Sequence, residues 1–209
     1  IMKAKHRMSL FGIFLIVLMS LSDMSIFAAT RTFDGGPGGT GTEWKTAANW
    51  SSDTKPTSTD DAVIPVGFTV KVDEDANVNN LTVAGVLEPN GSSSRVMTIE
   101  RDLTVSAGGE IHYTDSDLGS STGRMSWVFN GVDGGTNFIN NTGGASSDLQ
   151  FYNVTLDGDM ITTATKGSFY IYGSFTSTGG NFTAADGDGI IYFNEDASST
   201  SQTITPNGA

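Results

Sequence analysis

Few residues in this sequence are of the types that perform acid–base or nucleophilic chemistry. The chain has two histidines and no cysteine, which excludes disulfides, zinc–thiolate sites and cysteine nucleophiles. Beyond the segment 1–29 the only histidine is His112, in the stretch Glu110-Ile111-His112-Tyr113. A Ser-His-Asp triad would have to use it, and no nucleophile-elbow motif accompanies it. We therefore expect His112 to face solvent or a neighbouring segment and to have no catalytic role.

Carboxylates near basic side chains offer a second kind of chemistry. Polysaccharide lyases combine clustered carboxylates, which bind a cation, with an Arg or Lys base, and a glycosidase needs two carboxylates at a suitable separation. The candidates are Glu88, Glu100 and Glu110 with Arg95, Arg101 and Arg124. Because Glu100-Arg101-Asp102 is typical of an exposed charged turn, we assign no catalytic residue.

Two acidic stretches have the oxygen-rich composition of calcium-binding turns. They are Asp73-Glu74-Asp75-Ala76-Asn77 and Asp186-Gly187-Asp188-Gly189. Neither matches a twelve-residue calcium loop or a nine-residue calcium-binding repeat. We expect solvated turns here, and we assign no metal and no cofactor.

The charge balance argues against nucleic acid as a partner. The chain has 11 basic and 23 acidic residues and a formal net charge of -12. Affinity for nucleic acid comes mainly from Lys and Arg neutralising phosphates. A phosphate-binding surface is therefore not expected.

The segment 1–29 resembles a leader that is removed on export. A basic head at 2–7 is followed by apolar residues 10–19 and, further on, by the small pair Ala28-Ala29, the pattern of a secretory signal peptide. A retained membrane anchor is the alternative, but it needs about 20 apolar residues, and the run is interrupted from Ser20 onward. We expect cleavage after Ala28 or Ala29 and a secreted or cell-surface location, with no membrane contact afterwards.

From Asp61 onward the sequence consists of short β-branched and aromatic stretches between Gly, Asn and Asp turns, which indicates strands. No stretch after the leader has a helical apolar stripe, so the exported part is predicted to be all-β. The expected strands lie within 62–64, 68–72, 81–83, 96–99, 103–105, 127–129, 151–156, 169–172 and 190–193.

Short repeats in these stretches favour a solenoid with a period of about 22 positions. Leu81-Thr82-Val83 recurs at that offset as Leu103-Thr104-Val105. Longer echoes match Ile99–Thr104 with Ile171–Thr176 and Phe129-Asn130 with Phe193-Asn194. In such coils strands stack about 4.8 Å apart, so Leu81 would lie on Leu103 and Val83 on Val105. About seven coils would fit within 61–209; an antiparallel β-sandwich is the alternative.

Residues 30–60 are predicted to form an irregular N-terminal cap over the first coil. Glycine and proline are dense here, which breaks regular structure, while Trp44 and Trp50 indicate burial. No similar cap is evident near residue 209, and we expect the coils in 61–209 to be part of a longer reading frame with further domains.

An outward row of Thr and aromatic side chains could provide a flat binding face for glycans or another surface. Its expected members are Thr82, Thr104, Tyr170, Tyr172 and Tyr192. An ordinary solvated sheet face is the alternative.

Two stretches carry a resemblance to known proteins. Asn49-Trp50, Pro56, Asp60–Val72 and Asn80–Leu87 resemble the entry of large secreted bacterial β-helix proteins and are similar to the eight-glycine β-strand domain. A second set of stretches resembles repeats in surface and secreted proteins of Bacteroidota, often type IX secretion cargo: Phe129–Gly131, Phe151–Leu156, Phe193-Asn194 and Gln202–Thr205. The resemblance implies a right-handed parallel β-helix that serves as stalk, adhesin or scaffold. The eight-glycine pattern is incomplete, so it implies no enzymatic role.

The sequence therefore predicts a single right-handed parallel β-helix, preceded by a signal peptide and an N-terminal cap. We expect a non-enzymatic segment of an adhesin-like or scaffold protein, with extracellular glycans or cell-surface components as partners. A carbohydrate-active enzyme of the lyase or hydrolase class and a glycan-binding module remain the alternatives.

Overall fold

Short strands and tight turns dominate the computed structural model, which describes residues 28–114, 123–131, 136–141, 149–162, 169–179, 182–184, 191–193 and 204–205. The strands are β1 (Thr30–Thr32), β2 (Asp61–Ile64), β3 (Thr69–Val72), β4 (Ala76–Val78), β5 (Leu81–Val83), β6 (Val86–Pro89), β7 (Arg95–Ile99), β8 (Leu103–Val105), β9 (Glu110–Ile111), β10 (Met125–Phe129), β11 (Thr136–Asn141), β12 (Leu149–Phe151), β13 (Val154–Leu156), β14 (Asp159–Thr162), β15 (Phe169–Ile171), β16 (Phe175–Ser177), β17 (Phe182–Ala184), β18 (Ile191–Phe193) and β19 (Ile204–Thr205).

Helical structure in the described part is confined to three 3₁₀ turns, η1 (Gly36–Gly38), η2 (Ala47–Asn49) and η3 (Ser51–Asp53). Nothing in these ranges is a helix of the length and apolarity that crossing a bilayer demands. The prediction of a β-rich chain is confirmed for the described residues.

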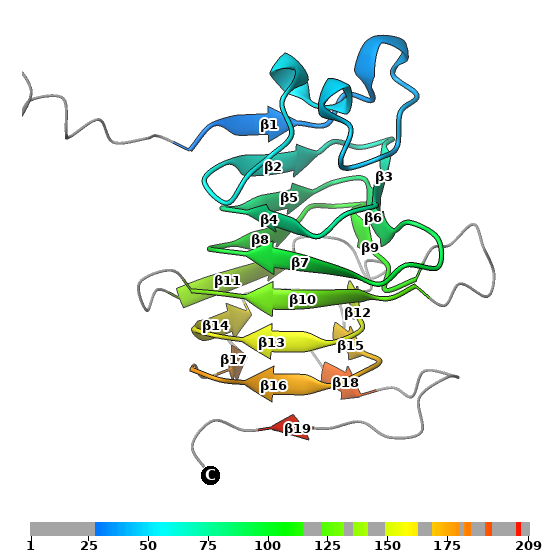
Figure 1. Cartoon of the computed structure of the whole chain (residues 1–209). Helices are drawn as coiled ribbons and strands as arrows, with labels where there is room; N and C mark the ends of the chain where they lie inside the picture. Colours follow the sequence, from blue (N-terminus) through cyan, green and yellow to red (C-terminus); the bar gives the residue numbers. More distant parts are fainter. Residues whose placement is uncertain are drawn as a thin grey trace, which may run out of the picture.

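The strands form three parallel sheets, and each strand from β2 onward pairs with the strand three places along the chain. The β1–β17 sheet has the order β1-β2-β5-β8-β11-β14-β17; the β3–β18 sheet contains β3, β6, β9, β12, β15 and β18; the β4–β19 sheet contains β4, β7, β10, β13, β16 and β19. Figure 1 shows successive strands of each sheet one above another. Every pairing between these strands is parallel, from β1–β2 to β16–β19, so an antiparallel sandwich is excluded for this part.

Alternation along each strand separates the core from the outer faces. Leu81 pairs with Leu103, and Val83 with Val105, and all four side chains are fully buried. The pairing predicted from the repeated Leu-Thr-Val is confirmed. The inward residues of the three sheets form one buried apolar cluster, which extends from Phe33, Trp44 and Trp50 to Phe169 and Ile171.

The predicted period of about 22 positions holds for some layers and not for others. Paired residues are 22 apart between Leu81 and Leu103 and between Phe169 and Ile191, but 19 apart between Ala62 and Leu81 and 36 apart between Leu103 and Ile139. The connections therefore differ in length, because only the strands have to match from one layer to the next. In the described part β2 to β19 form six successive triplets, one fewer than the expected seven.

The two longer sequence repeats do not occupy equivalent positions in the structure. Ile99 ends β7 in the β4–β19 sheet, whereas Ile171 ends β15 in the β3–β18 sheet. Phe129 and Phe193 are likewise divided between these two sheets. Similar short stretches recur because the strands of all three sheets need an apolar residue at every second, inward position. The same stretch can therefore form a strand in any of the sheets.

The segment at 30–60 lies at the β2 end of the stack (Figure 1). Its strand β1 extends the β1–β17 sheet by pairing with β2. Trp44 and Trp50 pack edge-to-face with ring centroids 4.7 Å apart, and Trp50 Nε1 donates to the Trp44 carbonyl over 2.8 Å. Both rings are buried because they join the inward residues of the first strands.

Candidate functional site

The outer face of the β3–β18 sheet brings together Lys71, Glu88, Glu110 and His112 with several tyrosines. We call the line Lys71, Glu88, His112, Gln150, Tyr170 and Tyr192 the outward column. Lys71 pairs with Glu88 and Tyr170 with both Gln150 and Tyr192. His112 falls in the same line because Ile111, its neighbour, pairs with Leu87 and with Leu149.

The first half of the outward column is an ion-pair network centred on a buried carboxylate. Glu88 is fully buried, and its Oε1 lies 3.6 Å from Lys71 Nζ. His112 Nδ1 lies 3.4 Å from Glu88 Oε2 and His112 Nε2 lies 3.0 Å from Glu110 Oε2. A buried carboxylate requires compensating charge and hydrogen bonds, which the lysine and the imidazole supply.

The two carboxylates raise the pKa of His112 above its ordinary value of 6.5. The hydrogen bond to Glu88 is the largest cause; the hydrogen bond and charge of Glu110 act in the same direction, and partial burial opposes both. The imidazolium form is favoured because it can donate from both ring nitrogens, one to each carboxylate.

This geometry leaves little room for glycosidase or lyase chemistry. Glu88 and Glu110 lie close together, as the two carboxylates of a glycosidase must. The His112 ring, however, lies between them. A hydrolase needs the space between its two carboxylates for the sugar or for a water. Of the two expected surroundings of His112, solvent or a neighbouring segment, the structure shows the second: its side chain is 23% exposed and contacts Glu88 on the neighbouring strand β6.

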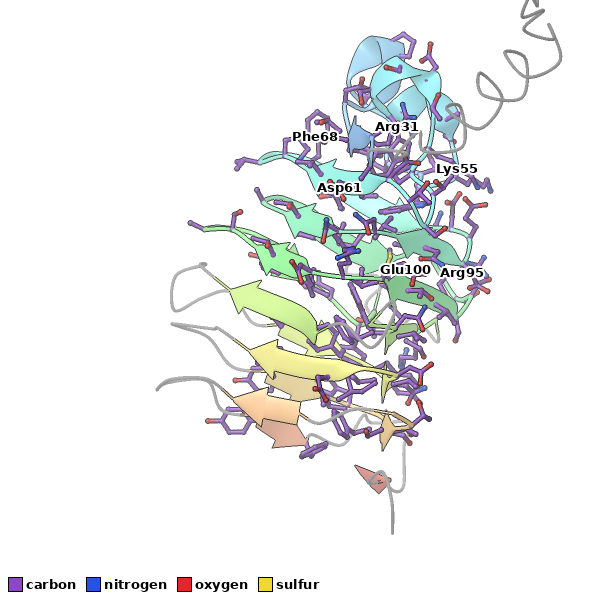
Figure 2. All side chains as sticks on the ribbon, turned by 90° about the vertical axis from the view of Figure 1, so that its left-hand side faces the viewer. Arg31, Lys55, Asp61, Phe68, Arg95 and Glu100 are labelled. Atoms are coloured by element: carbon purple, nitrogen blue, oxygen red, sulfur yellow. The ribbon has the colours of Figure 1, made fainter. Side chains whose placement is uncertain are left out.

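The other enzyme candidates lie elsewhere. Arg95 starts β7 and Glu100 follows its end, and both are labelled along that layer in Figure 2. Glu100 is buried rather than part of an exposed turn, and it accepts a 2.6 Å hydrogen bond from Asn130 Nδ2. Arg101, the next residue, is exposed. The structure therefore does not bring Glu100, Arg95 and Glu110 together.

The second half of the face is aromatic and contains Arg124. The Arg124 guanidinium lies 5.6 Å from the centroid of the Tyr113 ring and 5.7 Å from that of Tyr152, within the range of a cation–π interaction. Tyr113 stacks on Tyr172 at 4.0 Å. Tyr152 and Tyr113 were not predicted as members of a site; the sequence signal for them is only their place beside strand ends.

The predicted row of Thr and Tyr is divided between two sheets. Thr82 and Thr104 pair in the β1–β17 sheet, whereas Tyr170 and Tyr192 pair in the β3–β18 sheet. Tyr170 stacks on Tyr192 at 5.0 Å and on Tyr172 at 6.4 Å. The rings of Tyr170, Tyr172 and Tyr192 therefore form one contiguous aromatic group, and the Tyr192 side chain is 39% exposed at its edge.

The acidic stretch 73–77 uses its carboxylates on separate protein partners. Asp73 accepts from the Lys45 backbone N–H over 2.9 Å and lies 3.1 Å from Lys45 Nζ. Glu74 pairs with Lys55, and Asp75 accepts from the Val96 N–H. In the described ranges no group of three or more His, Asp or Glu side chains could hold a metal ion. The stretch 186–189 lies outside the described residues.

Three asparagines that begin Asn-X-Ser/Thr sequons, Asn49, Asn80 and Asn153, are buried or hydrogen-bonded through their side-chain amides. Asn153 donates to Ser126 Oγ over 3.1 Å and accepts from the Ser174 N–H. Asn80 Nδ2 donates to Asp61 over 2.8 Å, and Asn49 is buried. Asn80 and Asn153 thus link neighbouring layers, whereas Asn49 donates to the Glu43 carbonyl within the segment 30–60.

The ion-pair network predicts a pH-dependent stability. Because the pKa of His112 is raised in the folded state, protonation stabilises the fold below the unfolded value of about 6.5. This contribution is lost as the pH rises through the higher, folded-state pKa. We expect the unfolding free energy of residues 30–209 in urea to fall over that interval.

His112→Gln is expected to remove this pH dependence while keeping one hydrogen-bond donor. The other histidine of the chain is His6, so residues 30–209 contain no second imidazole that would complicate the measurement. An equal pH slope in His112→Gln and in the parent would contradict the role of the network.

Comparison with known proteins adds no relative to this picture: no family model, no curated protein and no solved structure matches the chain.

Proposed function

We propose that residues 61–209 form a single right-handed parallel β-helix, capped at its N-terminal end by residues 30–60. The pairing of each strand with the strand three places along supports it, because a chain that visits three sheets in a fixed order returns to the first after each triplet. The right hand is the one that parallel crossovers adopt in about 98% of cases. The buried line that continues from Trp50 through Trp127 to Ile171 is the core such a helix would have.

The function we propose is that of a non-enzymatic scaffold segment of a secreted or surface adhesin-like protein. The observation that carries this proposal is the ion-pair network on the outer face of the β3–β18 sheet, in which His112 contacts the carboxylates of both Glu88 and Glu110, and Lys71 pairs with Glu88. Side chains that hold each other in this way stabilise a layer and leave neither carboxylate free to act as acid or base. The basic head and apolar run within 1–29 support export.

Incubation with neutral and acidic polysaccharides tests the proposal against the enzyme alternative. Residues 30–209 are expected to release no reducing ends and no unsaturated products from any of them. Cleavage by the parent that is abolished in Glu110→Gln and retained in Glu74→Gln, a carboxylate outside the outward column, would overturn the scaffold function. Circular dichroism of both variants verifies that each is folded.

A further inference from the structure

All five tyrosines of the chain lie on strands of the β3–β18 sheet or close after their ends. They are connected to one another: Tyr113 and Tyr152 both contact the Arg124 guanidinium. Tyr172 lies against Tyr113 and Tyr170, and Tyr170 lies against Tyr192. The phenols of this protein are thus concentrated on one side of the molecule, a property that the outer faces of the other two sheets do not share.

Two pairs of rings in this group are stacked nearly parallel. The Tyr113 and Tyr172 rings lie 4.0 Å apart at an interplanar angle of 10°, and the Tyr170 and Tyr192 rings lie 5.0 Å apart at 12°. Tyr170 and Tyr192 are also partners in the register of β15 and β18, whose backbones lie about 4.8 Å apart. The strand pairing therefore brings two phenols into contact before any reaction.

Phenols in contact couple when both are oxidised by one electron. Each tyrosine loses the hydrogen atom of its hydroxyl, and the two radicals join through a carbon–carbon bond between the ring positions next to the oxygens. The hydrogen on each of these carbons then moves to the oxygen, which restores both hydroxyls. The net loss is two hydrogen atoms, which reduce one hydrogen peroxide to two water molecules in a haem peroxidase. The torsion χ2 of tyrosine is soft, so stacked rings can turn until these carbons meet.

The two stacked pairs differ in how readily an oxidant would act on them. Tyr192 is 39% exposed, so an external oxidant reaches this pair directly. The Tyr113 ring of the other pair lies 5.6 Å from the Arg124 guanidinium, and a positive charge opposes removal of an electron from a nearby ring. In the described ranges no guanidinium lies over the rings of Tyr170 or Tyr192. Oxidation should therefore favour the Tyr170/Tyr192 pair.

We infer that Tyr170 and Tyr192 form a site of oxidative cross-linking, at which a peroxidase and hydrogen peroxide produce a dityrosine. The bond would join β15 to β18 in a chain that has no cysteine and so no disulfide to link its layers. This inference depends on the pairing of β15 with β18 and is independent of the scaffold function.

Treatment of dilute residues 30–209 with a haem peroxidase and hydrogen peroxide tests the inference. We expect the blue fluorescence of dityrosine and, after proteolysis, a joined pair of peptides that contains Tyr170 and Tyr192 and is two hydrogen atoms lighter than its parts. Tyr192→Phe is expected to remove this pair, because phenylalanine keeps the stacked ring and lacks the hydroxyl that is oxidised. Circular dichroism of the variant verifies that it is folded.

Tyr152→Phe is the matched control. It removes a phenol of the same group that belongs to neither stacked pair and lies against Arg124, and it is expected to leave the yield of the Tyr170–Tyr192 link unchanged. The inference is overturned by a folded parent that gives no dityrosine, or that gives it only between chains, as covalent dimers. A link between Tyr113 and Tyr172 in place of the Tyr170–Tyr192 link, or equal loss in Tyr152→Phe, would also overturn it.

Discussion

Trp127→Ala is expected to lower the unfolding free energy by about 3–5 kcal/mol, the usual cost of deleting a fully buried large ring. Trp127 is 0% exposed in the middle strand β10. It packs edge-to-face on Phe151 at 5.2 Å and stacks on Phe129 at 6.2 Å. Removal of the indole would leave a cavity bordered by two layers, which urea denaturation of the variant would measure.

Trp127→Phe separates the ring from its N–H group. The Trp127 Nε1 atom is buried and has no hydrogen-bond partner, so a change to Phe, which lacks the N–H group, breaks no hydrogen bond and removes an unsatisfied donor. We expect most of the stability to be retained. A loss in Trp127→Phe as large as in Trp127→Ala would contradict the packing explanation.

Gly109→Ala is the second substitution with a large expected effect, about 3 kcal/mol of destabilisation from overpacking. A Cβ at Gly109 would overlap the carbonyl oxygen of Val83 in the strand layer above, and this carbonyl already accepts from the Ser106 N–H over 2.8 Å. Backbone cannot rotate away as a side chain can, so β5 and β8 would have to separate. Thermal and urea denaturation would both report the loss.

The neighbouring Gly108 provides the control. It has a positive φ of 85°, and nothing lies within 4 Å of a Cβ added to it. Gly108→Ala should therefore cost only the left-handed backbone conformation, about 1–2 kcal/mol. If Gly108→Ala proved the more harmful of the two, close approach between layers would not be the reason for glycine at 109.

The sequence predicts those parts of the fold that depend on short, local patterns of residues. The tripeptides Leu81-Thr82-Val83 and Leu103-Thr104-Val105 have the same sequence, and they pair residue by residue. Their alternation also predicts which side chains are buried. A repeat does not predict pairing for Ile99 and Ile171, because the alternation of apolar residues in a strand does not indicate to which of the three sheets the strand belongs.

The outward column was not predictable as a unit, because its members are separated by unequal intervals. The stretch of chain between Lys71 and its partner Glu88 is shorter than the stretch between Glu88 and His112, so no single period brings the three together. Glu88, Glu110 and His112 were each recognised as capable of chemistry. Their mutual neutralisation depends on pairing between layers, and that pairing becomes visible only once the lengths of the turns are known.

The two ends of the buried core are closed to different degrees, and this has a consequence for how the molecule comes apart. Phe33, Trp44 and Trp50 at the β2 end are at most 1% exposed, whereas Phe193 on β18 is 40% exposed. In a stack where each layer contacts only its neighbours, loss of order spreads from the weaker terminus. Amide hydrogens should therefore exchange in a gradient that is fastest around β18 and slowest near β2, so that the chain unzips in one direction.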